Sequence, residues 1–261
     1  MNYLITPRQT LSIARQAGLG ADSLSLSGMA ILTFSKAVVH RLSELCILEN
    51  IEWISHRHHP YSAAELVKRG TYEGMKVTVL VPPMGASPLA CILEDLAACR
   101  VQVILLVCAA WSLGPPVNFG DLIIPFFSIG PDGTSIHYGN RLEHVSANPQ
   151  VVEVLSMTSR KLSMNIHVGG NASCEALYRI TSKMVTNFRD QNCLSMENGE
   201  VNTLFTVTRT LGVFSGALLQ PYIDLQEGWN PARLDEKYMA TCHRQAEIAL
   251  EAGYQLMQKS C

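Results

Sequence analysis

Two segments of the chain place carboxylates or a glycine where a ligand could bind. Gly85 stands in Pro83–Ser87, between an apolar run and a helical pattern. A glycine there lets backbone N–H groups approach an anion or a sugar, and the N-terminus of the next helix favours negative charge. The same pattern is typical of an ordinary strand-to-helix turn. No lysine follows and the chain has no GxGxxG motif, so it carries neither nucleotide-phosphate fingerprint.

The second segment is Ser195–Glu200, which contains two carboxylates and a methionine. Glu197 could hold the vicinal hydroxyls of a sugar while the Met196 thioether packs against the ring. In the alternative interpretation the segment caps a helix, and Glu197 or Glu200 complements the helix dipole. The residues alone leave both interpretations open.

Two loops rich in histidine or hydroxyl groups are further candidates. Residues 132–138 carry Ser135 and His137, and such a loop either binds a polar ligand or a neighbouring subunit, or is a turn capped by its own hydroxyls. Residues 56–59 read His-Arg-His-His. The sequence has no second ligand cluster with zinc spacing, so we expect a solvated loop with Arg57 and no metal site.

Apolar strand patterns and amphipathic helix patterns alternate along the chain. The expected strands are 29–34, 76–81, 101–110, 121–127, 166–172 and 213–220, and the expected helices are 36–48, 87–99, 149–162, 200–211 and 234–258. Residues 183–189 fit neither pattern clearly. The alternation predicts an α/β fold with a mainly parallel sheet, and no linker divides the chain, so we expect one domain over 1–261.

Composition excludes several classes of protein. The chain has 261 residues, a net charge of −2 and 16% charged residues, so nothing indicates nucleic-acid binding, and the low charge suggests a buried subunit interface. No apolar run reaches the roughly 18 residues of a membrane span. The eight cysteines include no CxxC pair and the N-terminus has no signal-peptide pattern, so we expect reduced thiols and a cytoplasmic location.

Taken in order, several segments resemble the nucleoside phosphorylase family of the purine and uridine phosphorylase type, in its uridine phosphorylase-like branch. Residues 117–124 (VNFGDLII) are similar to the family's V-x-x-G-D strand, and 133–138 (GTSIHY) to a branch pattern. Residues 173–178 (SCEALY) resemble S/T-x-D-x-F-Y, and Met196-Glu197 stand where the family has its E-M-E ribose motif.

The resemblance implies a three-layer α/β/α sandwich around a mixed, twisted sheet, assembled as a homo-oligomer (dimer or hexamer). It implies cleavage of the N-glycosidic bond of a nucleoside, uridine-like or an analogue, without a cofactor. Glu197 would grip the ribose hydroxyls and stabilise an oxocarbenium-like transition state. His137, Tyr222 and, with a two-residue shift, Asp224 are candidates for acid-base work. The implied substrate-binding residues are Phe34, Gly85, Trp111, Ser135, Glu175, Tyr178 and Met196.

The phosphate site departs from the family pattern. The first loop reads Phe34-Ser35-Lys36 without the family's Gly-Asp and Arg, and 106–111 (LVCAAW) lacks an Arg and a hydroxyl. Arg57 and Lys36 are the remaining phosphate candidates. Phosphorolysis by a pentosyltransferase and hydrolysis by a nucleosidase therefore both stay open. So do a repurposed enzyme for another small molecule and a non-catalytic ligand-binding or partner subunit.

Overall fold

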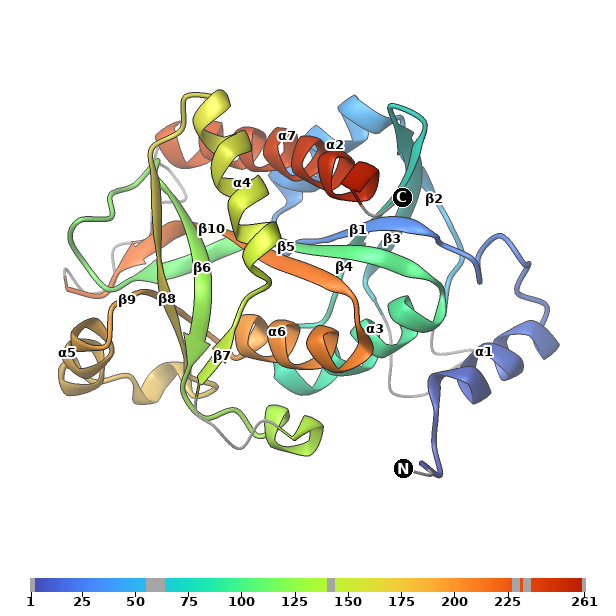
Figure 1. Cartoon of the computed structure of the whole chain (residues 1–261), viewed down its shortest axis with the longest axis horizontal. Helices are drawn as coiled ribbons and strands as arrows, with labels where there is room; N and C mark the ends of the chain where they lie inside the picture. Colours follow the sequence, from blue (N-terminus) through green and yellow to red (C-terminus); the bar gives the residue numbers. More distant parts are fainter. Residues whose placement is uncertain (1–2, 55–63, 140–143, 227–230, 232–235, 260–261) are drawn as a thin grey trace.

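The computed structural model describes residues 3–54, 64–139, 144–226, 231 and 236–259. Its centre is a mixed sheet of ten strands (Figure 1). The strands follow the order β10-β6-β8-β9-β5-β1-β4-β3-β2, and β7 pairs with β6. The strands are β1 (Gly28–Leu32), β2 (Glu49–Asn50), β3 (Leu66–Tyr72), β4 (Met75–Val81), β5 (Val101–Ser112), β6 (Leu122–Ile129), β7 (His144–Ser146), β8 (Ile166–Ser173), β9 (Cys193–Glu197) and β10 (Phe214–Asp224). The helices are α1 (Pro7–Gln16), α2 (Lys36–Cys46), α3 (Ala86–Ala98), α4 (Pro149–Lys161), α5 (Ser182–Asp190), α6 (Glu200–Leu211) and α7 (Glu236–Lys259).

Strand β5 holds the two halves of the sheet together. It is almost wholly buried, as expected for an apolar run covered on both faces. It pairs in parallel with β1 on one side and β10 on the other, and its end also pairs antiparallel with β9. Since β10, β6, β8, β9 and β5 are joined in turn, these five strands form a closed ring, and β1-β4-β3-β2 extends from it.

The sheet contains more antiparallel strand pairings than the alternation of strand and helix patterns predicts. Five of its ten strand pairings are antiparallel, so the mainly parallel sheet is wrong and the mixed sheet implied by the resemblance is confirmed. The alternation fixes the order of elements along the chain. It does not fix which distant strands pair, and β6–β10 and β5–β9 are such pairs.

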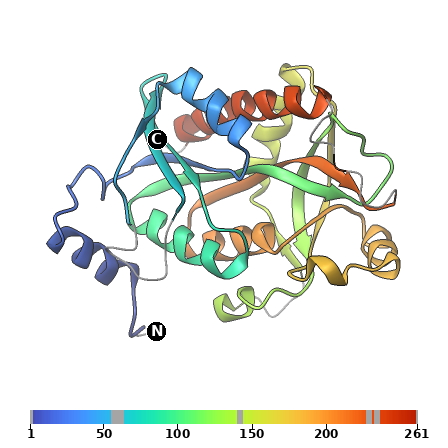
Figure 2. The same ribbon diagram turned by 180° about the vertical axis from the view of Figure 1, so that it is seen from behind.

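Helices cover both faces of the sheet, which confirms the three-layer arrangement (Figures 1 and 2). On one face α2, α4 and α7 bury Leu42, Leu155 and Ile248 in a common apolar cluster. On the other face α3 and α6 bury Leu93 and Phe205 in a second cluster. Burial of apolar surface on both sides is the main stabilising contribution to this arrangement.

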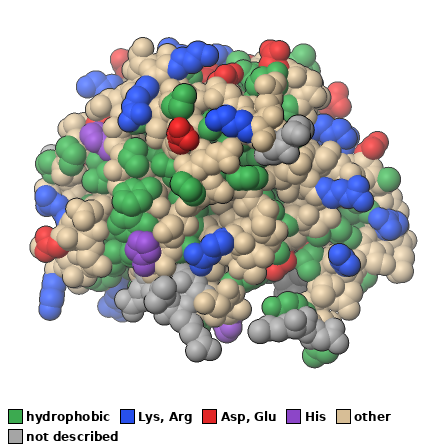
Figure 3. All heavy atoms as spheres, viewed as in Figure 1, with side chains coloured by type: hydrophobic (Ala, Val, Ile, Leu, Met, Phe, Trp, Pro, Cys, Tyr) green, Lys and Arg blue, Asp and Glu red, His purple; other side chains and the backbone are tan. Residues whose placement is uncertain are grey.

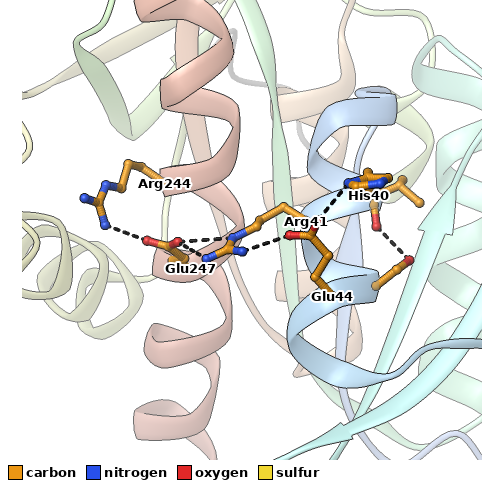
Figure 4. Close-up of polar contacts among 7 residues, drawn as sticks. His40, Arg41, Glu44, Arg244 and Glu247 are labelled. Carbon is orange, nitrogen blue, oxygen red and sulfur yellow. Dashed lines mark hydrogen bonds and ion pairs between the residues drawn. The ribbon is translucent and has the colours of Figure 1, made fainter.

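Helices α2 and α7 are also joined by charged side chains (Figure 4). Arg41 donates to Oε1 of Glu247 from Nε at 3.2 Å and from Nη2 at 2.7 Å, and to Glu44 from Nη1 at 2.8 Å. Arg244 donates to the second oxygen of Glu247 at 2.7 Å. Solvent screens these partly exposed groups. The network therefore links the two helices but contributes little to the stability of the fold.

Apolar side chains gather on the face of the molecule where β6 and β8 lie (Figure 3). Phe126 of β6 and Val168 of β8 are 46% and 42% exposed there. With Thr186 and Arg189 of α5 they line a broad hollow of about 660 Å3. No helix among the described residues is long and apolar enough to cross a membrane.

The structure contains elements that the sequence patterns miss. Strand β3 has no apolar alternation (LVKRGTY) because its residues are only half-buried towards the edge of the sheet. Helix α1 lies near the N-terminus and buries only Thr10 and Ala14. The ambiguous stretch 183–189 is helix α5, which Thr181 caps by accepting a hydrogen bond from the N–H of Met184.

The buried carboxyl group of Asp95, in α3, allows a test of how burial affects the pH dependence of stability. Its side chain is 4% exposed, and burial, followed by the charge of Glu94, raises its pKa to about 7. A raised pKa means that the folded state favours the protonated acid. The resulting stability is fully present below the unfolded pKa of about 4 and is lost as the pH rises through about 7.

We therefore expect Asp95→Asn to increase the free energy of unfolding at pH 8 by about 2–4 kcal/mol and to leave it nearly unchanged at pH 4. Urea unfolding at the two pH values measures this. Asp190→Asn, which changes an exposed aspartate of α5, is the matched control. Equal pH dependence in Asp95→Asn and the wild type would contradict the assignment.

Candidate active site

A cavity of about 250 Å3 lies beyond the carboxyl ends of the parallel strands β4, β1, β5 and β10. Ligands of open α/β sheets bind at this edge, because the loops after parallel strands meet there. The end of β9 and the first turns of α6 and α7 complete the wall. The lining residues are Phe34, Ser35, Met84, Cys108, Ala109, Ala110, Trp111, Met196, Glu197, Asn198, Glu200, Tyr222 and Tyr238.

Among the described side chains that line the cavity, that of Glu197 accepts the most hydrogen bonds. Its Oε1 accepts hydrogen bonds from Nδ2 of Asn171 at 2.9 Å and from Oγ of Ser173 at 2.8 Å, both on β8. Its Oε2 accepts from the backbone N–H groups of Glu200 and Val201 in the first turn of α6. The carboxyl group of Glu197 therefore caps α6 and ties it to two strands.

A second buried carboxyl group stands beside it. Glu200 is 4% exposed, and its Oε1 accepts a hydrogen bond of 2.9 Å from the N–H of Gly85. Burial raises the pKa of Glu197 well above its ordinary value, and the hydrogen bond and charge of Glu200 raise it further, against the opposing effect of Ser173 and Asn171. Burial and the neighbouring carboxyl group therefore both favour the protonated form of Glu197, which raises its pKa.

Another part of the cavity wall is aromatic. The rings of Tyr222 and Tyr238 have centroids 5.7 Å apart. Burial raises the pKa of Tyr238, and burial with the charges of Glu200 and Glu197 raises the pKa of Cys108 well above its usual range. Tyr238 therefore remains a hydrogen-bond donor, and Cys108 is not an activated thiolate.

The side-chain amides of two buried glutamines hold α7 against the sheet behind the aromatic residues. Nε2 of Gln245 donates to the carbonyl oxygens of Cys108 on β5, at 3.0 Å, and Leu218 on β10, at 2.8 Å. Nε2 of Gln220 donates to Oε1 of Gln245 at 2.9 Å. Helix α7, which carries Tyr238 at the cavity, is thus hydrogen-bonded to both strands through the side chain of Gln245.

Trp111 lines both this cavity and a second one, also of about 250 Å3. The residues that line the second cavity are Trp111, Leu177, Tyr178, Ile180, Thr181, Ser182, Val185, Ile223 and Leu225. Trp111 pairs with Met196 across β5 and β9 and with Ile223 across β5 and β10. Its backbone is therefore fixed on both sides.

The sequence pattern of the phosphorylase superfamily matches residues 29–250, a range that includes every residue lining the first cavity. The chain belongs to the phosphorylase superfamily. This confirms the resemblance described above.

Individual relatives in this superfamily are distant. A guanosine phosphorylase from Halorubrum lacusprofundi is 23% identical over 206 residues, which cover 79% of this chain and 82% of that protein. A uridine phosphorylase from Klebsiella aerogenes is 22% identical over 212 residues, 76% of this chain and 81% of that protein. Crystal structures of the uridine phosphorylase of Vibrio fischeri and the purine nucleoside phosphorylase of Toxoplasma gondii, 21% and 18% identical, superpose with TM-scores of 0.77 and 0.76. They cover 90% and 91% of this chain and 95% and 94% of their own. At this identity the structures show a shared fold.

Several of the site residues predicted from the sequence lie together around the first cavity. Gly85 is bonded to Glu200 at the edge of the first cavity. The five predicted site residues that line the cavity are Phe34, Trp111, Met196, Glu197 and Tyr222.

Other predicted residues lie outside the first cavity and make local contacts. Ser135 donates its hydroxyl proton to Asp132 at 2.7 Å, and Glu175 accepts from the N–H of Gly133 at 3.0 Å. Asp224 accepts from the N–H of Gln226 at 2.8 Å. The contact of Ser135 with Asp132 fits the turn-and-cap interpretation of residues 132–138.

The remaining predicted residues are exposed or fall outside the described ranges. His137 and Lys36 are exposed, and Tyr178 is 93% exposed and lines the second cavity. The stretch 56–59, with Arg57, lies outside the described residues. In the part of the chain that the structure describes, no group of three His, Cys, Asp or Glu side chains is placed to hold a metal ion.

Glu200, Cys108 and Tyr238 belong to the cavity, although sequence reasoning does not select them. Glu200 shows the expected pattern of a helix-dipole residue, and its position next to Gly85 depends on the packing of α3 against α6. Tyr238 stands at the start of a long amphipathic helix. No local pattern marks such a residue as functional.

Gly85 is the turn residue on which the loop between β4 and α3 depends. Its φ of 105° and ψ of 158° lie in a region that only glycine adopts readily. A Cβ built there would meet no atom closer than 3.9 Å. We expect Gly85→Ala to lower the free energy of unfolding by about 1–3 kcal/mol through backbone strain alone.

Denaturant unfolding tests this expectation, with Gly20→Ala as the control. Gly20 has an ordinary φ and open space around its Cβ, so that variant should change stability by less than about 0.5 kcal/mol. Equal stability of the two variants would show that the turn can relax to another conformation.

Proposed function

We propose that the first cavity binds a nucleoside and that the protein cleaves its N-glycosidic bond. The observation that carries the proposal is the meeting of Met196 and Glu197 with the glycine turn at the carboxyl edge of the sheet, in a chain of the phosphorylase superfamily. Relatives named for guanosine and for uridine phosphorolysis support the reaction class. We propose a uridine-like substrate as the first to test.

The chemistry of the lining residues fits this reaction. Met196 lines the cavity, where its thioether would pack against a sugar ring. Stretching of the glycosidic bond builds positive charge on the sugar, and the Glu197–Glu200 pair places negative potential beside it. Tyr222, in the aromatic part of the wall, is our proposed hydrogen-bond donor to the departing base.

Hydrolysis is the second candidate for the attacking step. Glu197 and Glu200 both line the cavity, and negative charge on either side chain would repel a phosphate dianion but not a neutral water molecule. Arg57 and Lys36 remain the proposed phosphate ligands if phosphorolysis takes place. A repurposed enzyme and a non-catalytic subunit are the outcomes in which no nucleoside is cleaved.

The other properties expected from the sequence stay predictions. They are one domain over 1–261, a homo-oligomer and a cytoplasmic location. Light scattering of the purified protein measures the oligomeric state.

Product analysis tests the proposed reaction. Purified protein is incubated with uridine, guanosine and other nucleosides, with and without phosphate, and free base is measured by liquid chromatography. Release only with phosphate indicates phosphorolysis, and release without it indicates hydrolysis. Release from no nucleoside under either condition would overturn the proposal.

Replacement of Tyr222 tests the role of the aromatic wall. We expect Tyr222→Phe to lower the rate of base release by about 100-fold, because the departing base loses its donor. Tyr254→Phe is the matched control, since Tyr254 packs edge-on against Tyr72 away from the cavity and should keep the wild-type rate. Equal rates for the two variants would remove Tyr222 from the mechanism.

A further inference from the structure

A separate cavity of about 380 Å3 lies at the other ends of α6 and β10 from the first cavity. It is bounded by the last turn of α6, by the first residues of β10 and by residues 146–149 between β7 and α4. We call it the distal cavity. Its volume lies within the range of roughly 300–1,000 Å3 that is typical of small-molecule sites, and it shares no lining residue with the first cavity.

Part of the wall of the distal cavity is apolar. Phe205 belongs to α6 and is buried in the core on one face of the sheet. Val213 and Phe214, at the start of β10, are half-buried and pack against the core clusters of the two faces. The cavity therefore offers apolar and aromatic surface to the body of a ligand.

Two buried hydroxyl groups of the lining are already bonded to each other. Oγ1 of Thr208 donates to the carbonyl oxygen of Leu204 at 2.6 Å, and it lies 2.6 Å from Oγ of Ser215. Since Thr208 uses its proton on Leu204, Ser215 is the donor in the second bond. Neither hydroxyl group retains a proton for a ligand, so hydrogen-bond donors must come from other side chains of the lining.

Arg209 brings a positive charge that the distal cavity does not balance. None of the residues lining the cavity is Asp or Glu. Arg41 and Arg244 each pair with a glutamate, whereas Arg209 is bonded to no acidic side chain among the described residues. The last turn of α6 does not need this side chain as a cap, because the N–H groups of Gly212 and Val213 already donate to its carbonyl oxygens. The guanidinium group is therefore available to an anion.

The side-chain amide of Asn148 gives the same cavity a second donor. Its Oδ1 accepts hydrogen bonds from the N–H groups of Gln150 at 3.0 Å and Val151 at 3.3 Å, at the start of α4. These bonds fix the plane of the amide, and in the part of the chain that the structure describes its Nδ2 has no acceptor. Nδ2 is thus a preorganised donor that loses little side-chain freedom when it binds a ligand.

From the unbalanced charge, the fixed amide donor and the apolar wall together, we infer that the distal cavity binds a small aromatic carboxylate. The carboxylate accepts hydrogen bonds from the guanidinium group of Arg209 and from Nδ2 of Asn148, and the ring packs against Phe214. Hydrogen bonds between ionised partners are about twice as strong as neutral ones, so the site favours the anion over a neutral molecule of the same shape. The inference does not depend on the proposed function of the first cavity.

Two substitutions each remove one donor and keep the local structure. Arg209→Met retains an apolar stem without the charge. Asn148→Asp retains an oxygen that caps α4, since aspartate is as good an N-cap residue as asparagine, but it replaces the NH2 donor with an acceptor. Arg160→Met is the matched control, because Arg160 is an exposed arginine in the last turn of another helix, α4, and lies outside the cavity.

Ligand-observed NMR at pH 7 measures the binding of three probes. Benzoate has the ring and the charge, benzamide has the ring without the charge, and acetate has the charge without the ring. We expect the wild type to bind benzoate at least about tenfold more tightly than either of the others. We expect Arg209→Met and Asn148→Asp each to raise the Kd for benzoate at least about tenfold, with thermal midpoints within about 2 °C of the wild type. Arg160→Met should keep the wild-type Kd, and excess uridine should not displace benzoate.

Four results would overturn the inference. They are no binding to the wild type at about 10 mM benzoate, equal affinity for benzamide, an unchanged Kd in both donor variants, and displacement of benzoate by uridine, which would place the acid in the first cavity. If one variant loses more stability than expected, the Kd of the other decides.

Discussion

The carboxyl group of Glu197 connects the parts of the protein that form the cavity. It lies at the end of β9, accepts hydrogen bonds from two side chains of β8 and caps the first turn of α6. Without these bonds the start of α6 would leave buried N–H groups unpaired. The position of Glu200, and with it the hydrogen bond that Glu200 accepts from Gly85, therefore depends on this one carboxyl group. The free-energy cost of burying this carboxyl group is offset because its hydrogen-bond donors all belong to β8 and α6.

The cavity unites two different environments. Its carboxyl side is tied down by specific hydrogen bonds, whereas Trp111, Tyr222 and Tyr238 form an aromatic part of its wall. The amide pair Gln220 and Gln245 keeps that wall in place by bonding α7 to β5 and β10. This division suits the proposed ligand, which carries hydroxyl groups on its sugar and has a flat base. A nucleoside has this division.

Local patterns were enough to predict most of the elements, and they failed where pairing is distant. The apolar run at 101–110 predicts β5, and the periodicity at 200–211 predicts α6, because burial on both faces or on one face leaves a mark in the sequence. Strand β3 leaves no such mark, since its side chains are half-buried. The site follows the same rule. Met196 and Glu197 could be proposed from a motif, but Tyr238 reaches the cavity only through the packing of α7.

The closed ring of strands also affects how the chain can be made. Strand β5 is complete at residue 112, and its partner β10 begins at residue 214, about 100 residues later. At a synthesis rate of roughly 5–20 residues per second, the apolar edge of β5 waits on the order of 5–20 seconds on the ribosome for that partner. An unpaired apolar edge is a template for intermolecular pairing. The late synthesis of β10 thus leaves this edge of β5 open to other chains for the interval in which the ring is incomplete.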